Sequence, residues 1–384
     1  MKRTKILIFD PINSQGGSKI ATAHFLDCLP NSYHCYVLTS YPEHWQTFTE
    51  NRDNCHTVSL WQFSRLLNSE SGYWYLVRHF LMALQLLLLR ITTGPFQLAI
   101  GASCPSVDFA LHMAKYGRLF PVLQLIHGPI AKSKLVARAL IASDLVFFLP
   151  SAQSSIARCL SSVLDDSEIN DLFTQDRYQI MINGLPSHHW PQPYKHDQTS
   201  MSVLWAASLL KWKGLSLLLL ALENMPRRIS TSVCYIRPKS TPLDTDVAPQ
   251  DIENITWYDN PEAYDQIRSQ HSIFVSTSTS EPFGLSILEA MAAGLCPVIP
   301  ADDAWWDRQL VDGYHCLKYT PGDFVDLACK LQSLQHNPDL AHLLGKRAMV
   351  MAKSAYTTEH CYHHLIEKVT EISYAEHSGT ERYV

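Results

Sequence analysis

Short apolar runs alternate along this chain with segments whose apolar residues recur every three to four positions. The runs favour β-strands, and the recurring spacing is that of one helix face. This alternation predicts parallel strands connected by helices on both sheet faces. We expect a first series of strands at residues 6–9, 35–38, 98–100, 122–126, 145–148 and 179–182, and a second at 203–206, 233–236, 273–276 and 297–299.

The two series predict an α/β protein with two doubly wound parallel sheets. A polar, proline-containing segment at residues 187–198 separates them and is the expected linker. We therefore expect an N-terminal domain over residues 1–190 and a C-terminal domain over 191–354. Ligands of such sheets bind at the carboxyl ends of the strands, so we expect the site in a cleft between two facing domains.

A strand, a tight glycine turn and a helix follow one another between residues 273 and 294. The backbone N–H groups of Gly284, Leu285 and Ser286 would face an anion at the positive end of the helix dipole. Glu281 and Glu289 flank the turn, and their eight-residue spacing separates them by up to about 12 Å. That separation suits a site holding both ends of a nucleotide-linked sugar.

The string from Ser280 to Gly294, with its Glu-x7-Glu spacing, resembles family 4 of the retaining, nucleotide-sugar-dependent glycosyltransferases. The resemblance implies the GT-B architecture, with a final helix, here 355–384, packing back on the first domain. It also implies that Glu281 lies beside the donor sugar and that Glu289 binds the ribose. The backbone of Phe283, Gly284 and Leu285 would meet sugar and phosphate.

Two lysines, Lys211 and Lys213, lie on the loop that joins the strand at 203–206 to the next helix, where they could neutralise a departing diphosphate. The family's loop usually carries an Arg near its start and a Lys before a Gly. Lys213 matches, whereas Ser208 replaces the Arg. This departure leaves open whether the diphosphate clamp is complete.

Two features of the N-terminal half are also candidates. Gly16 and Gly17 precede a helix and would let a phosphate or sugar approach the backbone; a plain strand-to-helix turn is the alternative. His127 follows an apolar strand, at the sheet edge. The resemblance implies that it contacts the donor sugar, and a hydrogen-bonded structural histidine is the alternative.

No cofactor or metal is expected, because lysines and backbone amides would carry the charge of the leaving group. Asp302 and Asp303 are adjacent on a loop and would point in different directions, so we expect a surface role. His360 and His364 lie one helical turn apart and could together bind a metal ion. Clustered histidines on an exposed helix without acidic partners are usually solvated, so we expect no metal there.

The amino-acid composition indicates which partners and which cellular compartment to expect. A net charge of -5 without a long basic run argues against a protein that wraps nucleic acid. Ten cysteines without a Cys-x-x-Cys pair indicate reduced thiols. The N-terminus is interpreted as a first strand and not as a signal peptide, so we expect a cytoplasmic protein.

The apolar run at residues 80–89 is shorter than the roughly 20 residues that span a bilayer, and we expect a buried helix. The alternative is a helix in the membrane interface with Tyr73, Trp74 and Tyr75 as anchors. Just beyond His127 in the sequence, Lys132, Lys134 and Arg138 could form a basic strip suited to an acidic membrane surface or a lipid pyrophosphate, and a solvated helix face is the alternative.

These features predict a retaining transfer of sugar from a nucleotide-sugar donor to a glycan or lipid-linked acceptor, with peripheral contact to the inner membrane surface. The family suggests polysaccharide or lipopolysaccharide biosynthesis. A sugar-nucleotide 2-epimerase and a non-catalytic sugar-nucleotide-binding protein are the alternatives.

Overall fold

The computed structural model describes residues 4–50, 52–61, 72–117, 119–195, 201–238 and 243–378. Its contacts divide the chain into two compact units. The first comprises Met1–Ile182 and Tyr362–Val384, and the second comprises Asn183–Cys361. The boundary between Ile182 and Asn183 therefore lies before the segment at 187–198 that was expected as the linker.

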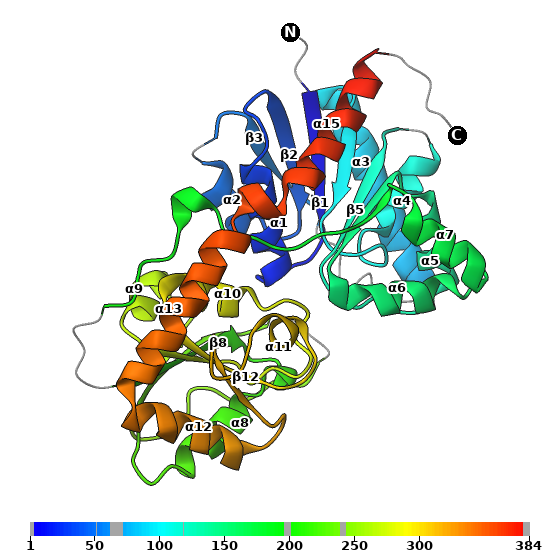
Figure 1. The fold of residues 1–384 in the computed structure, drawn as a ribbon. Helices are drawn as coiled ribbons and strands as arrows, with labels where there is room; N and C mark the ends of the chain where they lie inside the picture. Colours follow the sequence, from blue (N-terminus) through cyan, green and yellow to red (C-terminus); the bar gives the residue numbers. More distant parts are fainter. Residues whose placement is uncertain are drawn as a thin grey trace. The chain divides into compact units, whose positions relative to one another are not determined.

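In the described ranges the first unit contains one sheet of seven parallel strands (Figure 1), in the order β3-β2-β1-β4-β5-β6-β7. Central β1 is buried from Ile6 to Asp10, which is typical of a sheet covered on both faces. The strands are β1 Thr4–Asp10, β2 Tyr33–Thr39, β3 Cys55–Ser59, β4 Leu98–Gly101, β5 Val122–Ile126, β6 Leu145–Phe148 and β7 Tyr178–Ile180.

Helices connect these strands and bury their apolar faces against the sheet. Asp165 and Glu168, for example, form a capping box that fixes the start of α7. The helices are α1 Gly17–Asp27, α2 Pro42–Thr49, α3 Gly72–Thr93, α4 Phe109–Tyr116, α5 Lys134–Ala142, α6 Gln153–Leu160, α7 Asp166–Thr174 and α15 His363–Ser378.

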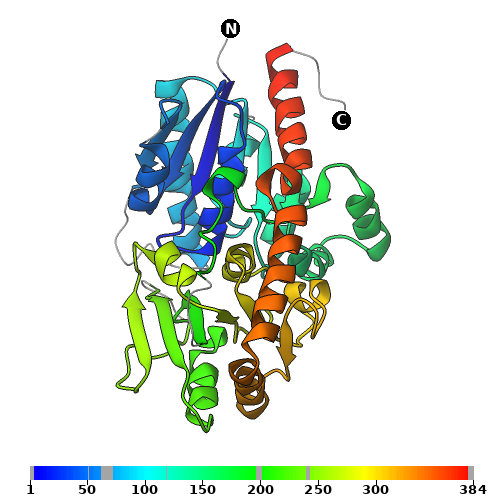
Figure 2. The same cartoon turned by 60° about the vertical axis from the view of Figure 1, so that its left-hand side comes forward.

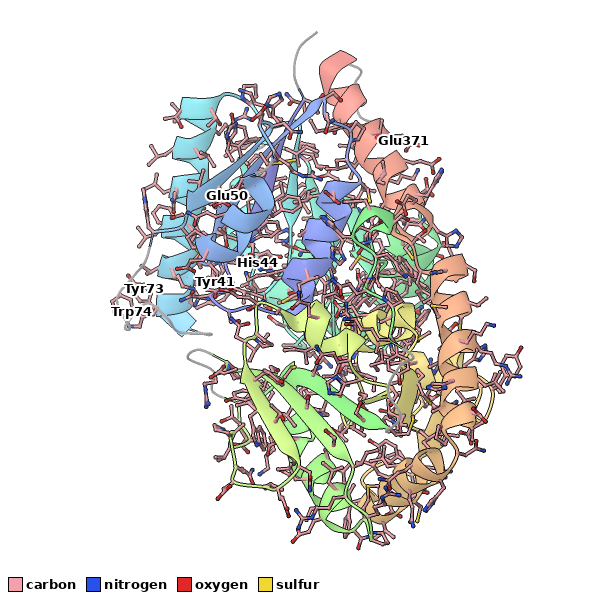
Figure 3. The ribbon with its side chains drawn as sticks, turned by 90° about the vertical axis from the view of Figure 1, so that its left-hand side faces the viewer. Tyr41, His44, Glu50, Tyr73, Trp74 and Glu371 are labelled. Carbon is pink, nitrogen blue, oxygen red and sulfur yellow. The ribbon has the colours of Figure 1, made fainter. Side chains whose placement is uncertain are left out.

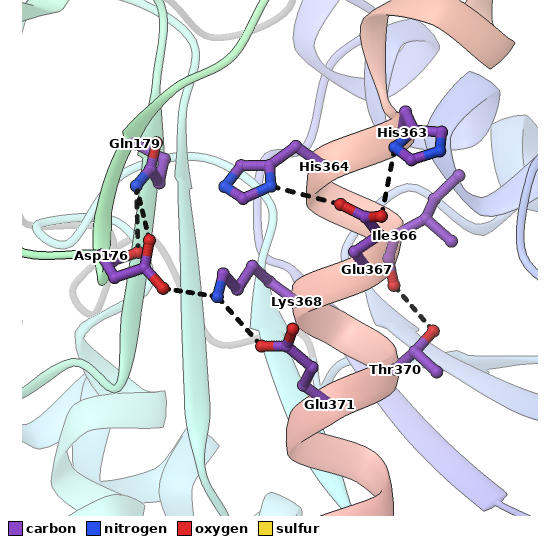
Figure 4. A network of polar contacts seen from close by, with 9 residues as sticks. All are labelled: Asp176, Gln179, His363, His364, Ile366, Glu367, Lys368, Thr370 and Glu371. Atoms are coloured by element: carbon purple, nitrogen blue, oxygen red, sulfur yellow. Dashed lines mark hydrogen bonds and ion pairs between the residues drawn. The ribbon is translucent and has the colours of Figure 1, made fainter.

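Helix α15 belongs to the first unit although it lies at the end of the chain. The Tyr362 hydroxyl, just before the helix, donates to the Ala21 carbonyl at 3.2 Å. Lys368 Nζ lies 2.5 Å from an Asp176 carboxylate oxygen and 3.0 Å from that of Glu371 (Figure 4). The Tyr362 contact joins the end of the chain to α1, and the Lys368–Asp176 pair joins α15 to the segment before β7.

Among its described residues, the second unit has a six-stranded parallel sheet in the order β10-β9-β8-β11-β12-β13. Figure 2 shows β8, β9 and β10 side by side. The strands are β8 Ser202–Ser208, β9 Ser230–Ile236, β10 Ile255–Asp259, β11 Ile273–Val275, β12 Cys296–Pro300 and β13 Leu317–Tyr319. The helices are α8 Leu215–Glu223, α9 Tyr264–Ser269, α10 Leu285–Ala293, α11 Trp305–Gln309, α12 Phe324–His336, α13 Pro338–Ala355 and α14 Thr358–Cys361.

The described part of the expected linker packs on the second unit. Trp190 Nε1 donates to the Ala292 carbonyl at 3.1 Å, and the Tyr194 N–H donates to the Ala293 carbonyl at 2.7 Å. Residues 187–195 therefore cover the C-terminal end of α10, whereas 196–198 lie outside the described residues.

Gly345 sets the approach of α13 to the end of α10. A Cβ atom at this position would lie 2.2 Å from the Gly294 carbonyl oxygen. We predict that Gly345→Ala lowers the free energy of unfolding by about 1–3 kcal/mol, because backbone must move to relieve the overlap. Urea denaturation measures this loss.

Ser354→Ala, on the exposed side of the same helix, is the control and should change stability by no more than about 0.5 kcal/mol. Equal stability of the two variants would contradict the close packing of α13.

Candidate functional site

The direction of chain progression reverses between β8 and β11 in the second sheet. From β8 the chain continues outward to β9 and β10, and from β11 it continues the other way to β12 and β13. Ligands of open parallel sheets bind at this switch point, beyond the carboxyl ends of the two strands. The loops that leave there are residues 209–214 and 276–284.

Backbone and side-chain hydrogen bonds join these two loops. Thr277 Oγ1 donates to the Lys213 carbonyl at 2.8 Å, and the Thr279 N–H donates to the Trp212 carbonyl at 2.8 Å. Gly214 adopts a left-handed conformation with φ of +73°, and a Cβ there would lie 2.3 Å from the Thr277 carbonyl oxygen. Only glycine permits this approach without strain.

The joined loops bring together two predicted catalytic residues that lie far apart in sequence. Lys213 Nζ lies 2.5 Å from a Glu281 carboxylate oxygen, and both side chains are less than one-fifth exposed. The ammonium also lies 4.0 Å from the centroid of the Trp212 ring. Glu281 borders a pocket that Ser276, Ser278 and Asp302 also line.

The predicted turn and helix start are present beside this pair. Gly284 has φ of +79° and caps α10, and its carbonyl accepts the Trp306 indole N–H at 3.1 Å. Within the described residues, no hydrogen bond occupies the N–H groups of Gly284, Leu285 or Ser286. These groups and the helix dipole can hold an anion.

The Phe283 side chain packs into an aromatic cluster next to the turn. It is buried against the rings of Trp305, Trp306 and Tyr356, whose centroids lie 5.4–6.4 Å away. Of this residue, only the backbone remains a candidate for donor contact.

Glu289 has a partner that the sequence reasoning missed. Arg268, buried in α9, donates from Nη1 to Glu289 Oε2 at 2.9 Å and also pairs with Asp265. Burial raises the pKa of the Glu289 carboxyl, and Arg268 opposes that rise. The sequence carries no signal for this contact, because Arg268 already has Asp265 three residues before it on the same helix.

The other polar candidates of this unit are placed differently. Lys211 is exposed, and its side chain makes no contact recorded within the described residues. Asp302 accepts the backbone N–H groups of Ser280 and Ala304, and exposed Asp303 pairs with Arg308. Asp303 therefore lies on the surface as expected, whereas Asp302 is half-buried and lines the pocket beside Glu281.

In the first unit, β1 and β4 form the equivalent switch point, and Gly16 and Gly17 follow β1. Gly16 has an extended φ of -174°, which any residue can adopt, and open space lies where its Cβ would be. Buried Lys19 pairs with Asp10 and donates to the Ile12 carbonyl at 2.7 Å, so it fixes this turn. The glycines offer room, but no left-handed turn.

His127 lies immediately after β5. Its Nε2 lies 3.4 Å from Thr22 Oγ1, and its Nδ1 is buried without a partner among the described residues. Burial lowers the pKa of His127 to about 4, so the ring is neutral at physiological pH. The ring as a whole is partly exposed, and a neutral imidazole can contact a sugar hydroxyl.

Asp108, which the sequence analysis did not single out, is buried in the connection between β4 and α4. Its Oδ2 accepts from the Ser103 N–H at 2.9 Å and from Gln124 Nε2 at 2.7 Å, whereas Oδ1 has no partner in the described ranges. Burial raises the pKa of this carboxyl to about 8.

Two doubly wound parallel sheets, one in each unit, define the GT-B class of fold. Solved structures share this fold. An Anabaena protein, Alr3699/HepE in complex with UDP and glucose, has a TM-score of 0.73 at 14% identity over 96% of this chain and 100% of that one. Sucrose-phosphate synthase from Thermosynechococcus elongatus has a TM-score of 0.69 at 15% identity, over 98% and 100% of the two chains.

A third structure, the lipopolysaccharide outer core galactosyltransferase WaaB, has a TM-score of 0.57 at 14% identity over 91% and 99% of the two chains. In sequence, the chain is 35% identical to sulfoquinovosyl transferase SQD2 of Arabidopsis thaliana over 89 residues. That match spans 22% of this chain and 17% of the relative.

Residues 187–351 match the model of the family Glycosyl transferases group 1. The second unit therefore matches this family over nearly its whole length, in agreement with the resemblance to retaining family 4 glycosyltransferases of GT-B fold. The predicted fold class of two doubly wound parallel sheets is likewise confirmed. The roles assigned to individual site residues stay predictions.

Asp108 gives a prediction for pH dependence. Its folded-state pKa of about 8 exceeds the ordinary value of 3.8, so the folded state holds this proton more tightly than the unfolded state does. The carboxyl therefore costs stability progressively as pH rises from about 4 to about 8. Asp108→Asn, which mimics the neutral form, should raise the melting temperature more at about pH 8 than at about pH 5.

Asp251→Asn, on an exposed loop, is the matched control and should shift melting equally at both pH values. A gain for Asp108→Asn that is the same at both pH values would contradict a buried, neutral Asp108.

Proposed function

We propose that this protein transfers a sugar from a nucleoside-diphosphate sugar to an acceptor hydroxyl with retention of the anomeric configuration. The observation that carries the proposal is the pairing of Lys213 with Glu281 at the switch point, beside the free N–H groups at the start of α10. Cationic and anionic groups side by side match a reaction that separates a cation-like sugar from an anionic diphosphate.

The leaving diphosphate would be held by Lys213 and by the amides of Gly284, Leu285 and Ser286, with Lys211 close by on the same loop. An ammonium and aligned N–H groups stabilise developing negative charge in a site from which water is excluded. These groups can carry the charge without a metal ion, which supports a metal-independent reaction.

The two carboxylates would serve different parts of the donor. Glu281 would lie beside the sugar ring, where positive charge develops, and Glu289 would accept hydrogen bonds from the ribose hydroxyls. Within the described residues, Arg268 donates to Oε2 of Glu289, which leaves the other carboxylate oxygen for that purpose. His127, whose ring is partly exposed, is proposed to contact the donor sugar.

The donor class and the setting are finer proposals. A UDP-sugar is the first candidate, because the Anabaena relative in fold is described in complex with UDP and glucose. Likeness to a lipopolysaccharide outer core galactosyltransferase favours an acceptor of cell-envelope polysaccharide or lipopolysaccharide assembly. All ten cysteines are free thiols, which fits a cytoplasmic location.

Three substitutions test the assignment of roles. Glu281→Gln and Lys213→Ala should lower sugar transfer by at least about 100-fold, because each removes charge stabilisation of the transition state. Glu289→Ala should mainly weaken donor binding.

A thermal-shift panel of UDP-, GDP- and ADP-sugars identifies the donor. Release of the nucleoside diphosphate, with envelope glycan and glycolipid fractions as acceptors, then measures transfer.

Lys368→Ala is the matched control, since Lys368 has the same 2.5 Å ion-pair distance and similar exposure but lies on α15. Its transfer rate should equal that of the wild type. Full turnover by Glu281→Gln or by Lys213→Ala would refute the proposal. Acceptor-independent formation of an altered sugar would instead identify an epimerase.

A further inference from the structure

Helix α3 presents a continuous apolar stripe to its surroundings. Six large side chains recur along it every three or four residues, and each is 39–72% exposed: Tyr73, Leu76, Phe80, Leu84, Leu88 and Ile91. From first to last they cover about 27 Å of helix. The outward face of a surface helix is normally polar, so this face requires an explanation.

The opposite side of α3 is fixed to the first unit. Met82 and Leu86 belong to the core beneath the helix. Gln85 donates to the Ser59 carbonyl and accepts the Trp61 N–H, both at 2.9 Å, and His79 Nδ1 accepts the Ala110 N–H at 3.1 Å. The exposed stripe therefore cannot rotate inward.

The length and exposure of α3 differ from the expectation for the apolar run at residues 80–89. The helix is 22 residues long, so by length and composition it could cross a membrane, and most of it is not buried. The expected short, buried helix is therefore wrong on both counts. Its polar anchors to the sheet nevertheless favour a helix that lies on a surface over one that spans.

Charge on the neighbouring helices is of one sign. Helices α3, α4 and α5 contain no Asp or Glu, and they share a small apolar cluster that includes Tyr75, Phe109 and Ala139. Their basic residues are Arg78, Arg90, Lys115, Lys134 and Arg138. Lys134 and Arg138 are exposed, as is Lys132 just before α5, whereas Lys115 pairs with Asp144.

Aromatic residues stand at the N-terminal end of the stripe. Figure 3 shows Tyr73 and Trp74 on the first turn of α3, directed away from the first sheet. Tyr and Trp favour the boundary between lipid headgroups and acyl chains, because each has an apolar body and a polar tip.

We propose that the exposed stripe of α3 docks on an anionic lipid bilayer, with the helix axis in the membrane plane. The apolar side chains enter the headgroup boundary, and the arginines of α3 with the basic residues of α5 contact anionic headgroups. A bilayer explains the apolar stripe and the single sign of charge together. The proposal goes beyond sugar transfer and does not depend on it.

Vesicle co-sedimentation tests this docking with the full chain. The protein should bind vesicles containing about one-third phosphatidylglycerol more tightly than vesicles of phosphatidylcholine alone, and salt should weaken the binding. The double variant Phe80→Ser with Leu84→Ser should lose at least about tenfold in vesicle affinity. Lys134→Glu with Arg138→Glu should abolish the preference for anionic vesicles.

Leu343→Ser with Val350→Ser is the matched control, because it removes two similarly exposed apolar side chains from α13 and should leave vesicle binding unchanged. Melting curves of all variants exclude loss of folding as the cause. Absence of wild-type binding, or equal binding by the two double-serine variants, would overturn the proposal. If light scattering instead showed a dimer that only the α3 variant dissociates, without vesicle binding, the stripe would belong to a second copy of the chain.

Discussion

The close approach of Gly214 to the carbonyl of Thr277 is the constraint on which the candidate site depends. Because glycine at 214 lets the loop after β8 lie against the loop after β11, Lys213 reaches Glu281 across 68 residues of sequence. Thr277 reinforces the approach, since its hydroxyl donates to the Lys213 carbonyl and accepts the Trp205 indole N–H. A larger residue at 214 would separate the two charged groups.

Burial explains which strands the sequence revealed. All the expected strands occur, and the three that the sequence did not reveal, β3, β10 and β13, each lie at the edge of a sheet. An edge strand is covered less completely than a central one, so its residues need not be apolar. The burial of β10, with no fully buried residue, contrasts with that of β12, where all five are buried.

The site was predictable where its chemistry is local. The turn at Gly284 and the following helix are a short-range pattern, so the sequence indicated them correctly. Contacts between elements were not predictable in either unit: Arg268 reaches Glu289 from α9 in the second, and Asp108 accepts from Gln124 of β5 in the first. Such contacts depend on sheet order and helix packing, which residue spacing does not encode. Gly16 and Gly17 have ordinary backbone geometry, so the backbone alone does not explain this pair, and their proposed contact with the donor stays a prediction.

The central claim is that the backbone at the start of α10 binds the diphosphate of a nucleotide sugar. The most direct measurement is a titration of the isotope-labelled protein with UDP, followed through the amide resonances of Gly284, Leu285 and Ser286. The account predicts that these three amide protons shift downfield together and saturate with the same dissociation constant, as N–H groups do when they begin to donate to phosphate oxygens. Saturable binding of UDP that leaves all three resonances unmoved would contradict it.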